Sequence, residues 1–280
     1  MNSNKINIYD NYANRFRALL IALLLIQTQL CVASNNEKET LIFGLLPSES
    51  AITKFKRYAP LRDYLSKKLN RNIHLETARN FPAFIKRTKE GRYDFLETAP
   101  HFVIPAIDSK KYRVITTIIQ PLSAQIVVLE KSKYLNLSHL AGLTIATPSP
   151  KAIITKLGKD TVNKVLSHAP TYKTYKTHNA AYESVLGHNS DAAIISVNVF
   201  NKAIRQHIPL RVIGESNKIP NMSILVSTRM SRSLEDKLQT TLISMKKTDT
   251  GIRVLKEISY PGYRKATAKE FNPIRSYLKQ

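Results

Sequence analysis

The stretch TIATPSPKAIITKLG, residues 144–158, joins an apolar strand-like run to a helix-like run across two prolines that flank a serine. The same succession of a strand-like run and an amphipathic run at helical spacing recurs between residues 41 and 216. Such alternation predicts an α/β fold with mainly parallel sheets. In folds of this kind, ligands bind at the carboxyl ends of the strands.

Length and charge limit what the chain can be. Its 280 residues suffice for one large domain or two modest ones, and 43% of them are hydrophobic, as in ordinary globular proteins. Lys and Arg number 43 against 20 Asp and Glu, which gives a net charge of +23. This surface attracts anions of many kinds, from nucleic acid and phospholipid to small acidic solutes, and charge alone does not select among them.

The N-terminus has the pattern of a secretory signal peptide. Two arginines precede an apolar run, residues 18–30, and small residues follow before a polar stretch. The apolar run is shorter than the roughly 20 residues that a transmembrane helix needs. We therefore expect residues 1–34 to be a signal peptide, cleaved after Ala33 or Ser34, and the protein to be periplasmic. Cys31 is the only cysteine and leaves with this segment, so we expect no disulfide.

Two further strand-like runs divide the chain into two lobes. AQIVVLEK at 124–131 reads as a strand that crosses to a second α/β unit, and IPNMSILVS at 219–227 reads as a strand that leads back. We expect residues 35–122 and 224–280 to form a discontinuous lobe 1 and residues 123–223 to form lobe 2. Two crossing strands permit a hinge, with the ligand bound between the lobes.

Six segments carry a resemblance to a known family, and they span almost the whole chain after the signal peptide. They are FGLLPSES (43–50), APLRDYLSKKLN (59–70), GRYDFLETAPHFVIPA (91–106), LAGLTIATPSP (140–150), THNAAYESVLGHNSDAAIIS (177–196) and YPGYRKATAKEFNPIRSYL (260–278). In this order they resemble the phosphate/phosphite/phosphonate-binding family of periplasmic solute-binding proteins, which serve ABC transporters. The resemblance implies a two-lobed type II periplasmic binding protein, or venus flytrap, that binds a small oxyanion reversibly.

The loop Pro148-Ser149-Pro150-Lys151 lies at the expected cleft in lobe 2. Ser149 suits the N-cap of a helix that starts at Pro150. The hydroxyl and the free N–H groups of a helix start also suit an oxyanion, to which Lys151 adds charge unless it is only solvated. Family members that capture phosphonates usually carry Ser-Thr-Ser-Gly here. The present loop has fewer hydroxyls and one fewer N–H, which leaves open a phosphonate, another anion or a degenerate site.

Two pairs of residues follow other strands. His178 aligns with a family position where a histidine reaches the ligand, and Asn179 is either a second contact or the N-cap of the helix. In lobe 1, Thr98 can donate a hydroxyl and His101 can donate when protonated. The alternative for this second pair is a capping role for the helix that begins at Pro100.

Further candidates are weaker. Ser48 follows the first strand, and Ser196 and Asn198 lie at the end of the strand DAAIIS (191–196). Phe81 stands where the family often has a tyrosine, so it either keeps an aromatic wall at the site or packs in the core. Glu97 is a puzzle beside an anion site, since it either accepts a proton from the ligand or points to solvent.

The chain lacks the common catalytic motifs. It contains no G-x-S-x-G, P-loop, H-E-x-x-H or G-x-G-x-x-G sequence, so we predict no enzyme activity, no cofactor and no metal site. We expect a monomeric solute-binding protein that traps a small oxyanion, such as phosphonate, phosphate or phosphite, for an ABC permease. Two alternatives remain. One is a sensing or interaction protein of the same fold that pairs with a membrane sensor. The other is a secreted basic protein that binds polyanions or anionic envelope surfaces.

Overall fold

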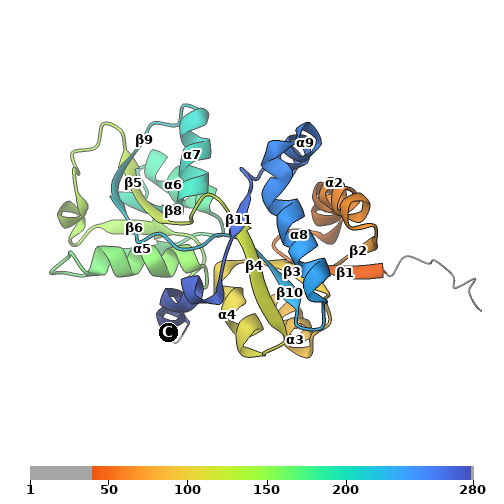
Figure 1. The fold of residues 1–280 in the computed structure, drawn as a ribbon. Helices are drawn as coiled ribbons and strands as arrows, with labels where there is room; N and C mark the ends of the chain where they lie inside the picture. Colours follow the sequence, from red (N-terminus) through yellow and green to blue (C-terminus); the bar gives the residue numbers. More distant parts are fainter. Residues whose placement is uncertain (1–39, 279–280) are drawn as a thin grey trace, which may run out of the picture. The chain divides into compact units, whose positions relative to one another are not determined.

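A computed structural model describes residues 40–278, and the expected signal peptide, residues 1–34, lies outside this range. The described strands form two sheets, and we call the six-stranded sheet with its helices lobe 1 and the five-stranded sheet with its helices lobe 2. Helices cover both faces of each sheet (Figure 1). Within residues 40–278, none of the helices combines the length and the apolar character needed to span a bilayer.

Lobe 1 is built on parallel strands whose carboxyl ends lie at one level. In spatial order, its strands are β11 (Tyr263–Lys265), β4 (Tyr112–Ile118), β10 (Ser223–Ser227), β3 (Phe95–Thr98), β1 (Thr40–Leu45) and β2 (Asn72–Thr77). Leu45, the last residue of β1, pairs in parallel register with Thr77 of β2 and with Glu97 of β3. The loops that follow these three strands therefore meet at the same edge of the sheet.

Apolar side chains at helical spacing fix the helices of lobe 1. One face carries α2 (Ala51–Leu69), α8 (Arg232–Ser244), the 3₁₀ helix η2 (Met245–Lys247) and α9 (Asp249–Glu257). The other face carries α3 (Phe81–Glu90), α4 (Pro100–Asp108) and the 3₁₀ helix η3 (Ala268–Tyr277). In α2, Tyr58, Leu61, Leu65 and Leu69 follow helical spacing in the sequence, and all four are buried against the sheet.

Lobe 2 repeats the scheme with a smaller sheet. In spatial order, its strands are β7 (Thr171–Thr174), β6 (Thr144–Thr147), β8 (Ala192–Ser196), β5 (Ala124–Leu129) and β9 (Leu210–Glu215). The 3₁₀ helix η1 (Leu137–Leu140) follows β5, α5 (Ile153–Asn163) packs on one face, and α6 (His178–Leu186) and α7 (Val197–Arg205) pack on the other. β6 is parallel to β7 and β8, so the loops after these strands also share one edge. Every residue of β8 is buried, as expected for a strand covered on both faces.

Two chain segments, residues 119–123 and 216–222, join the lobes, and we call them the crossing segments. Leu122 and Ile219 form an isolated antiparallel bridge, and the Nδ2 atom of Asn221 donates to the carbonyl of Gln120 at 3.1 Å. The prediction that the run 124–131 crosses between the lobes is wrong, because β5 pairs only within the sheet of lobe 2. The chain crosses before β5, in the sequence Gln120-Pro121-Leu122. Pro121 lacks an N–H group and therefore interrupts strand pairing there.

The 3₁₀ helix η3 contacts both lobes. Arg275 forms a bidentate ion pair with Asp108 of α4, with distances of 2.8 and 2.6 Å. Tyr277 contacts α5 of lobe 2, where its hydroxyl donates to Asp160 at 3.0 Å and its carbonyl accepts from Lys156 Nζ at 2.6 Å. This segment therefore joins α4 to α5 independently of the two crossing segments.

Two C-terminal elements differ from the sequence prediction. The run 267–279 reads as an α-helix, but it forms the 3₁₀ helix η3, in which Pro273 has no N–H to donate. β11 was not predicted, because three residues are too few to display an alternating pattern. The strand-like runs 124–131, 144–147, 191–196 and 219–227 contain β5, β6, β8 and β10, with shifts of a few residues at their ends, whereas the 3₁₀ helix η1 was not predicted.

Candidate functional site

The strand ends of lobe 2 place His178 beside Ser196. The backbone N–H of Ser196 donates to His178 Nδ1 at 3.2 Å. Burial lowers the pKa of His178 to about 4, so the imidazole is neutral at neutral pH. Because Nδ1 accepts a hydrogen bond, the ring proton is on Nε2. His178 therefore offers one N–H donor whose tautomer is set by the fold.

The residues around His178 have distinct roles. Thr177 caps α6, since its hydroxyl oxygen accepts from the N–H of Ala180 at 3.0 Å. The capping role considered for Asn179 is therefore wrong, and its exposed side chain is available to a ligand or to solvent. Ser196 is the N-cap of α7, where its hydroxyl oxygen accepts from the N–H of Val199 at 3.4 Å.

The loop 148–151 does not start a helix. The N–H of Ala152 donates to the carbonyl of Ser149 at 2.9 Å, which closes a turn, and Ala152 then adopts extended backbone with φ −71° and ψ 133°. α5 consequently begins at Ile153, and the predicted capping role of Ser149 is wrong. The side chains of Ser149 and Lys151 are exposed, and Lys151 forms no ion pair with a residue of the described range.

In lobe 1, Thr98 and His101 lie at the end of β3 and the start of α4. Ala99 occupies the N-cap position without a side-chain hydrogen bond, so Thr98 does not cap the helix. Burial, together with the charge of Lys156, lowers the pKa of His101 to about 4, and the protonated donor expected there is disfavoured in the free protein at neutral pH. Thr98 Oγ1 and His101 Nδ1 are buried and have no hydrogen-bond partner among the described residues.

Phe81 and Ser48 complete this edge of lobe 1. Phe81 is 42% exposed, so the core-packing alternative for it is wrong. The centroid of its ring lies 5.5 Å from that of Phe102, and the centroid of the His101 ring lies 4.1 Å from that of Phe102. The three rings form a small aromatic cluster. The hydroxyl of Ser48 accepts a hydrogen bond from Lys54 Nζ at 2.9 Å.

Glu97 is buried, and one of its two carboxyl oxygens is already hydrogen-bonded within the protein. Its side chain is 1% exposed, and Oε1 accepts hydrogen bonds from the hydroxyls of Tyr58, at 2.7 Å, and Tyr260. Burial raises the pKa of this carboxyl, although both tyrosine hydroxyls and the charge of Lys54 oppose the shift. The carboxyl is therefore a buried link between β3, α2 and the segment after α9.

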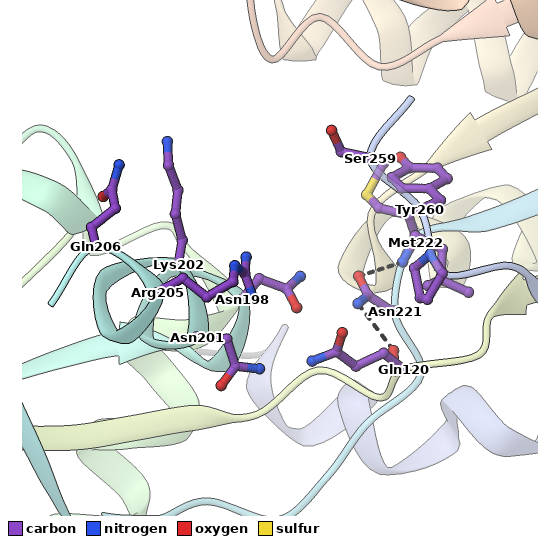
Figure 2. A pocket seen from close by; sticks show the side chains of 12 residues that line it. Gln120, Asn198, Asn201, Lys202, Arg205, Gln206, Asn221, Met222, Ser259 and Tyr260 are labelled. Carbon is purple, nitrogen blue, oxygen red and sulfur yellow. Dashed lines mark hydrogen bonds between the residues drawn. The ribbon is translucent and has the colours of Figure 1, made fainter. Parts of the chain in front are cut away.

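A polar pocket of about 630 Å³ lies where the lobes meet the crossing segments (Figure 2). Its lobe 2 wall is one side of α7 together with the residue that caps its end, and it presents Asn198, Asn201, Lys202, Arg205 and Gln206. The opposite wall comes from the crossing segments and from the turn after α9, and it presents Gln120, Asn221, Met222, Ser259 and Tyr260. The volume is within the range of sites for small molecules, roughly 300–1,000 Å³.

The predicted residues come together in two groups rather than one. His178 contacts Ser196 in lobe 2, and Phe81 and His101 share the Phe102 ring in lobe 1. Of the sequence candidates, only Asn198 lines the polar pocket. No group of three or more acidic or histidine side chains within residues 40–278 is arranged to hold a metal ion.

Sequence reasoning missed most of the pocket. One signal was available, because positions 198, 201, 202 and 205 are polar and follow the i, i+3, i+4, i+7 spacing of one helix face. That spacing marks a polar stripe without showing that a second wall faces it. The residues of the opposite wall come from remote segments and carry no such pattern.

A family model and several solved structures match the chain. The model is described as "ABC transporter, phosphonate, periplasmic substrate-binding protein" and matches residues 43–271. PhnD1 from Prochlorococcus marinus, solved in complex with methylphosphonate, is 14% identical with a TM-score of 0.68, covering 86% of this chain and 97% of that one. A binding protein component of an ABC phosphonate transporter from Pseudomonas aeruginosa is 14% identical with a TM-score of 0.60 and 85% coverage of both chains.

A third structure has the same fold and a different ligand. XAC2383 from Xanthomonas citri, solved with ATP, is 14% identical with a TM-score of 0.68, and the match covers 86% of this chain and 97% of that one. At such low identity these likenesses establish the two-lobed fold of periplasmic binding proteins and not a ligand.

Proposed function

Because the chain belongs to the periplasmic substrate-binding proteins of phosphonate ABC transporters, we propose that it captures a small phosphorus oxyanion between its lobes and delivers it to a permease. The family consists of transporter components rather than enzymes, so this chain is a periplasmic solute-binding protein. Export through cleavage of residues 1–34 is part of the proposal. The phosphonate class is supported by the family match and by the relative from Prochlorococcus marinus, which was solved with methylphosphonate.

The observation that carries the proposal is the fixed donor of His178. Its Nδ1 atom is occupied by the N–H of Ser196, and its lowered pKa keeps the ring neutral. A neutral N–H donor binds a phosphoryl oxygen without first needing a proton from solvent. The donor is therefore available over the whole range of pH near neutrality, which suits a protein that must bind an anion continuously.

The exposed hydroxyl of Ser149 and the buried hydroxyl of Thr98 supplement this donor from opposite lobes. Thr98 Oγ1 lacks a partner in the described structure, and a buried hydroxyl without a partner costs about 1–3 kcal/mol. An oxyanion that accepts from it would recover this free energy only when it reaches lobe 1. Ligand contacts to both lobes stabilise the closed form over the open one, and closure is then a population shift.

The departure at the loop 148–151 weakens the site relative to a Ser-Thr-Ser-Gly loop. α5 begins only at Ile153, so the first N–H groups of the helix are displaced from Ser149. The loop nevertheless keeps the Ser149 hydroxyl exposed. We therefore expect micromolar rather than nanomolar affinity for a simple phosphonate, which corresponds to about −8 kcal/mol.

The test is isothermal titration of the purified protein with methylphosphonate, phosphate, phosphite and sulfate. We expect His178→Ala to weaken phosphonate binding at least tenfold, since it removes the fixed donor and leaves the N–H of Ser196 without its acceptor. His178→Gln keeps a side-chain amide and should retain part of the affinity. The control is His74→Ala, which changes an exposed residue of β2 and should bind like the wild type. Full affinity in His178→Ala would remove this site from the proposal.

A further inference from the structure

The polar pocket beside α7 presents five polar side chains on one wall that have no partner among the described residues. Lys202 and Arg205 are exposed, and neither forms an ion pair within residues 40–278. The side-chain amides of Asn198, Asn201 and Gln206 likewise make no hydrogen bond to a described residue. Figure 2 shows these side chains on one wall, facing the crossing segments across the pocket. They are available to a ligand without breaking a contact in the free protein.

Short chain connections link the pocket to residues of the proposed phosphoryl site in both lobes. His178 accepts from the N–H of Ser196, and Asn198, two residues later, already lines the pocket. On the other wall, Tyr260 lines the pocket while its hydroxyl donates to Glu97, the neighbour of Thr98 in β3. A ligand whose phosphoryl group contacts His178 can therefore extend into the pocket between these two walls.

The charge of the pocket selects the kind of group that extends into it. None of the lining residues, all of which belong to the described range, is acidic. The Glu97 carboxyl behind Tyr260 is 1% exposed, so it is withheld from the pocket. Lys202 and Arg205 are three residues apart and thus lie on the same side of α7. Guanidinium and ammonium groups together suit a carboxylate or a phosphoryl group, whereas a ligand ammonium group would face two like charges and no carboxylate among the lining residues.

We propose that the ligand carries a second anionic group, which Lys202 and Arg205 bind while the side-chain amides of α7 contact the chain between its two ends. The proposal rests on the proposed function and names a narrower class, phosphonates or phosphates that bear a second acidic group. It also predicts discrimination against aminoalkylphosphonates, because the positive pocket repels their ammonium group.

The test is isothermal titration with ligands that share a phosphoryl end and differ at the other. We expect 3-phosphonopropionate and methylenediphosphonate to bind at least tenfold more tightly than methylphosphonate, and 2-aminoethylphosphonate to bind more weakly than methylphosphonate. In the double variant Lys202→Gln/Arg205→Gln, the ratio of the affinity for 3-phosphonopropionate to the affinity for methylphosphonate should fall from at least ten to about one. The matched control is Arg253→Gln/Lys256→Gln, which removes two exposed charges at the same spacing from α9 and should keep the advantage.

The outcomes separate this inference from the function on which it rests. Equal or tighter binding of 2-aminoethylphosphonate, or an advantage that survives in the α7 double variant, overturns the inference and leaves phosphonate capture standing. Glutarate, which has two carboxylates and no phosphorus, tests whether the phosphoryl end of the ligand is required. If it binds as tightly as 3-phosphonopropionate and loses affinity in the double variant, the pocket assignment holds and the phosphorus preference fails. If none of these anions binds, both proposals are overturned.

Discussion

The hydroxyl of Tyr58 is the point at which the buried carboxyl of Glu97 can be tested. Tyr58 is 1% exposed, donates to Glu97 Oε1 at 2.7 Å and lies 2.8 Å from the hydroxyl of Tyr260. Tyr58→Phe removes the donor and leaves the ring in place. Removing one partner of a buried hydrogen bond costs about 1–3 kcal/mol, and we expect a loss of about 2 kcal/mol in the free energy of unfolding. In a domain of this size that corresponds to a fall of roughly 4–8 °C in Tm.

The assay is urea unfolding followed by circular dichroism, with a thermal melt in parallel and no ligand present. Tyr64→Phe is the matched control, because Tyr64 lies on the same helix, is 7% exposed and makes no hydrogen bond to a described residue. We expect the control to change the free energy of unfolding by less than about 0.5 kcal/mol. Equal losses in the two variants, or a loss below about 0.5 kcal/mol for Tyr58→Phe, would refute the reasoning.

Three further predictions concern pH and packing. Because the pKa of Glu97 is raised in the folded state, the folded protein keeps a proton that the unfolded chain releases as pH rises above about 4.5, and the free energy of unfolding falls. Glu97→Gln should remove this contribution to the pH dependence of the free energy of unfolding, measured by urea unfolding. The pKa of His178 is lowered from 6.5 to about 4, so its contribution to stability is lost as pH falls through that window, and His178→Gln should flatten the profile there. In Gly251→Ala, the added Cβ would lie 2.2 Å from the carbonyl oxygen of Met245, and we expect a loss of about 3 kcal/mol or more, measured by thermal melting.

Local patterns predicted most of the fold. Strands such as DAAIIS are continuous apolar runs, and α2 shows its buried stripe in the printed sequence. The errors occurred where local chemistry was ambiguous. Ser149 and Pro150 are as common in a turn as at the start of a helix. Only the extended backbone of Ala152 shows that they form a turn and that the helix begins after it. The break before β5 depends on one proline within an otherwise strand-like run.

The site was harder to predict because its contacts are not local. The hydrogen bond between His178 and Ser196 depends on how α6 is set against β8, although strand ends and helix starts did indicate both residues. Glu97 gave no sign of burial, since its partners Tyr58 and Tyr260 are 39 and 163 residues away in the chain. The net charge of the chain likewise could not show that Lys202 and Arg205 of α7 line a pocket that has no acidic residue in its lining.

The bridge formed by η3 has a practical consequence for studying opening and closing. Arg275 pairs with Asp108 of α4 and Tyr277 bonds to α5, so any spreading of those two helices must strain or break contacts made by η3. Affinity tags, fluorophores or reporter domains fused after Leu278 would be attached directly to η3. They could perturb its contacts with α4 and α5 and so change the opening and closing that they are meant to record. Probe pairs for distance measurements are better placed on exposed positions such as Lys67 and Lys173, one in each lobe and remote in sequence from the carboxyl terminus.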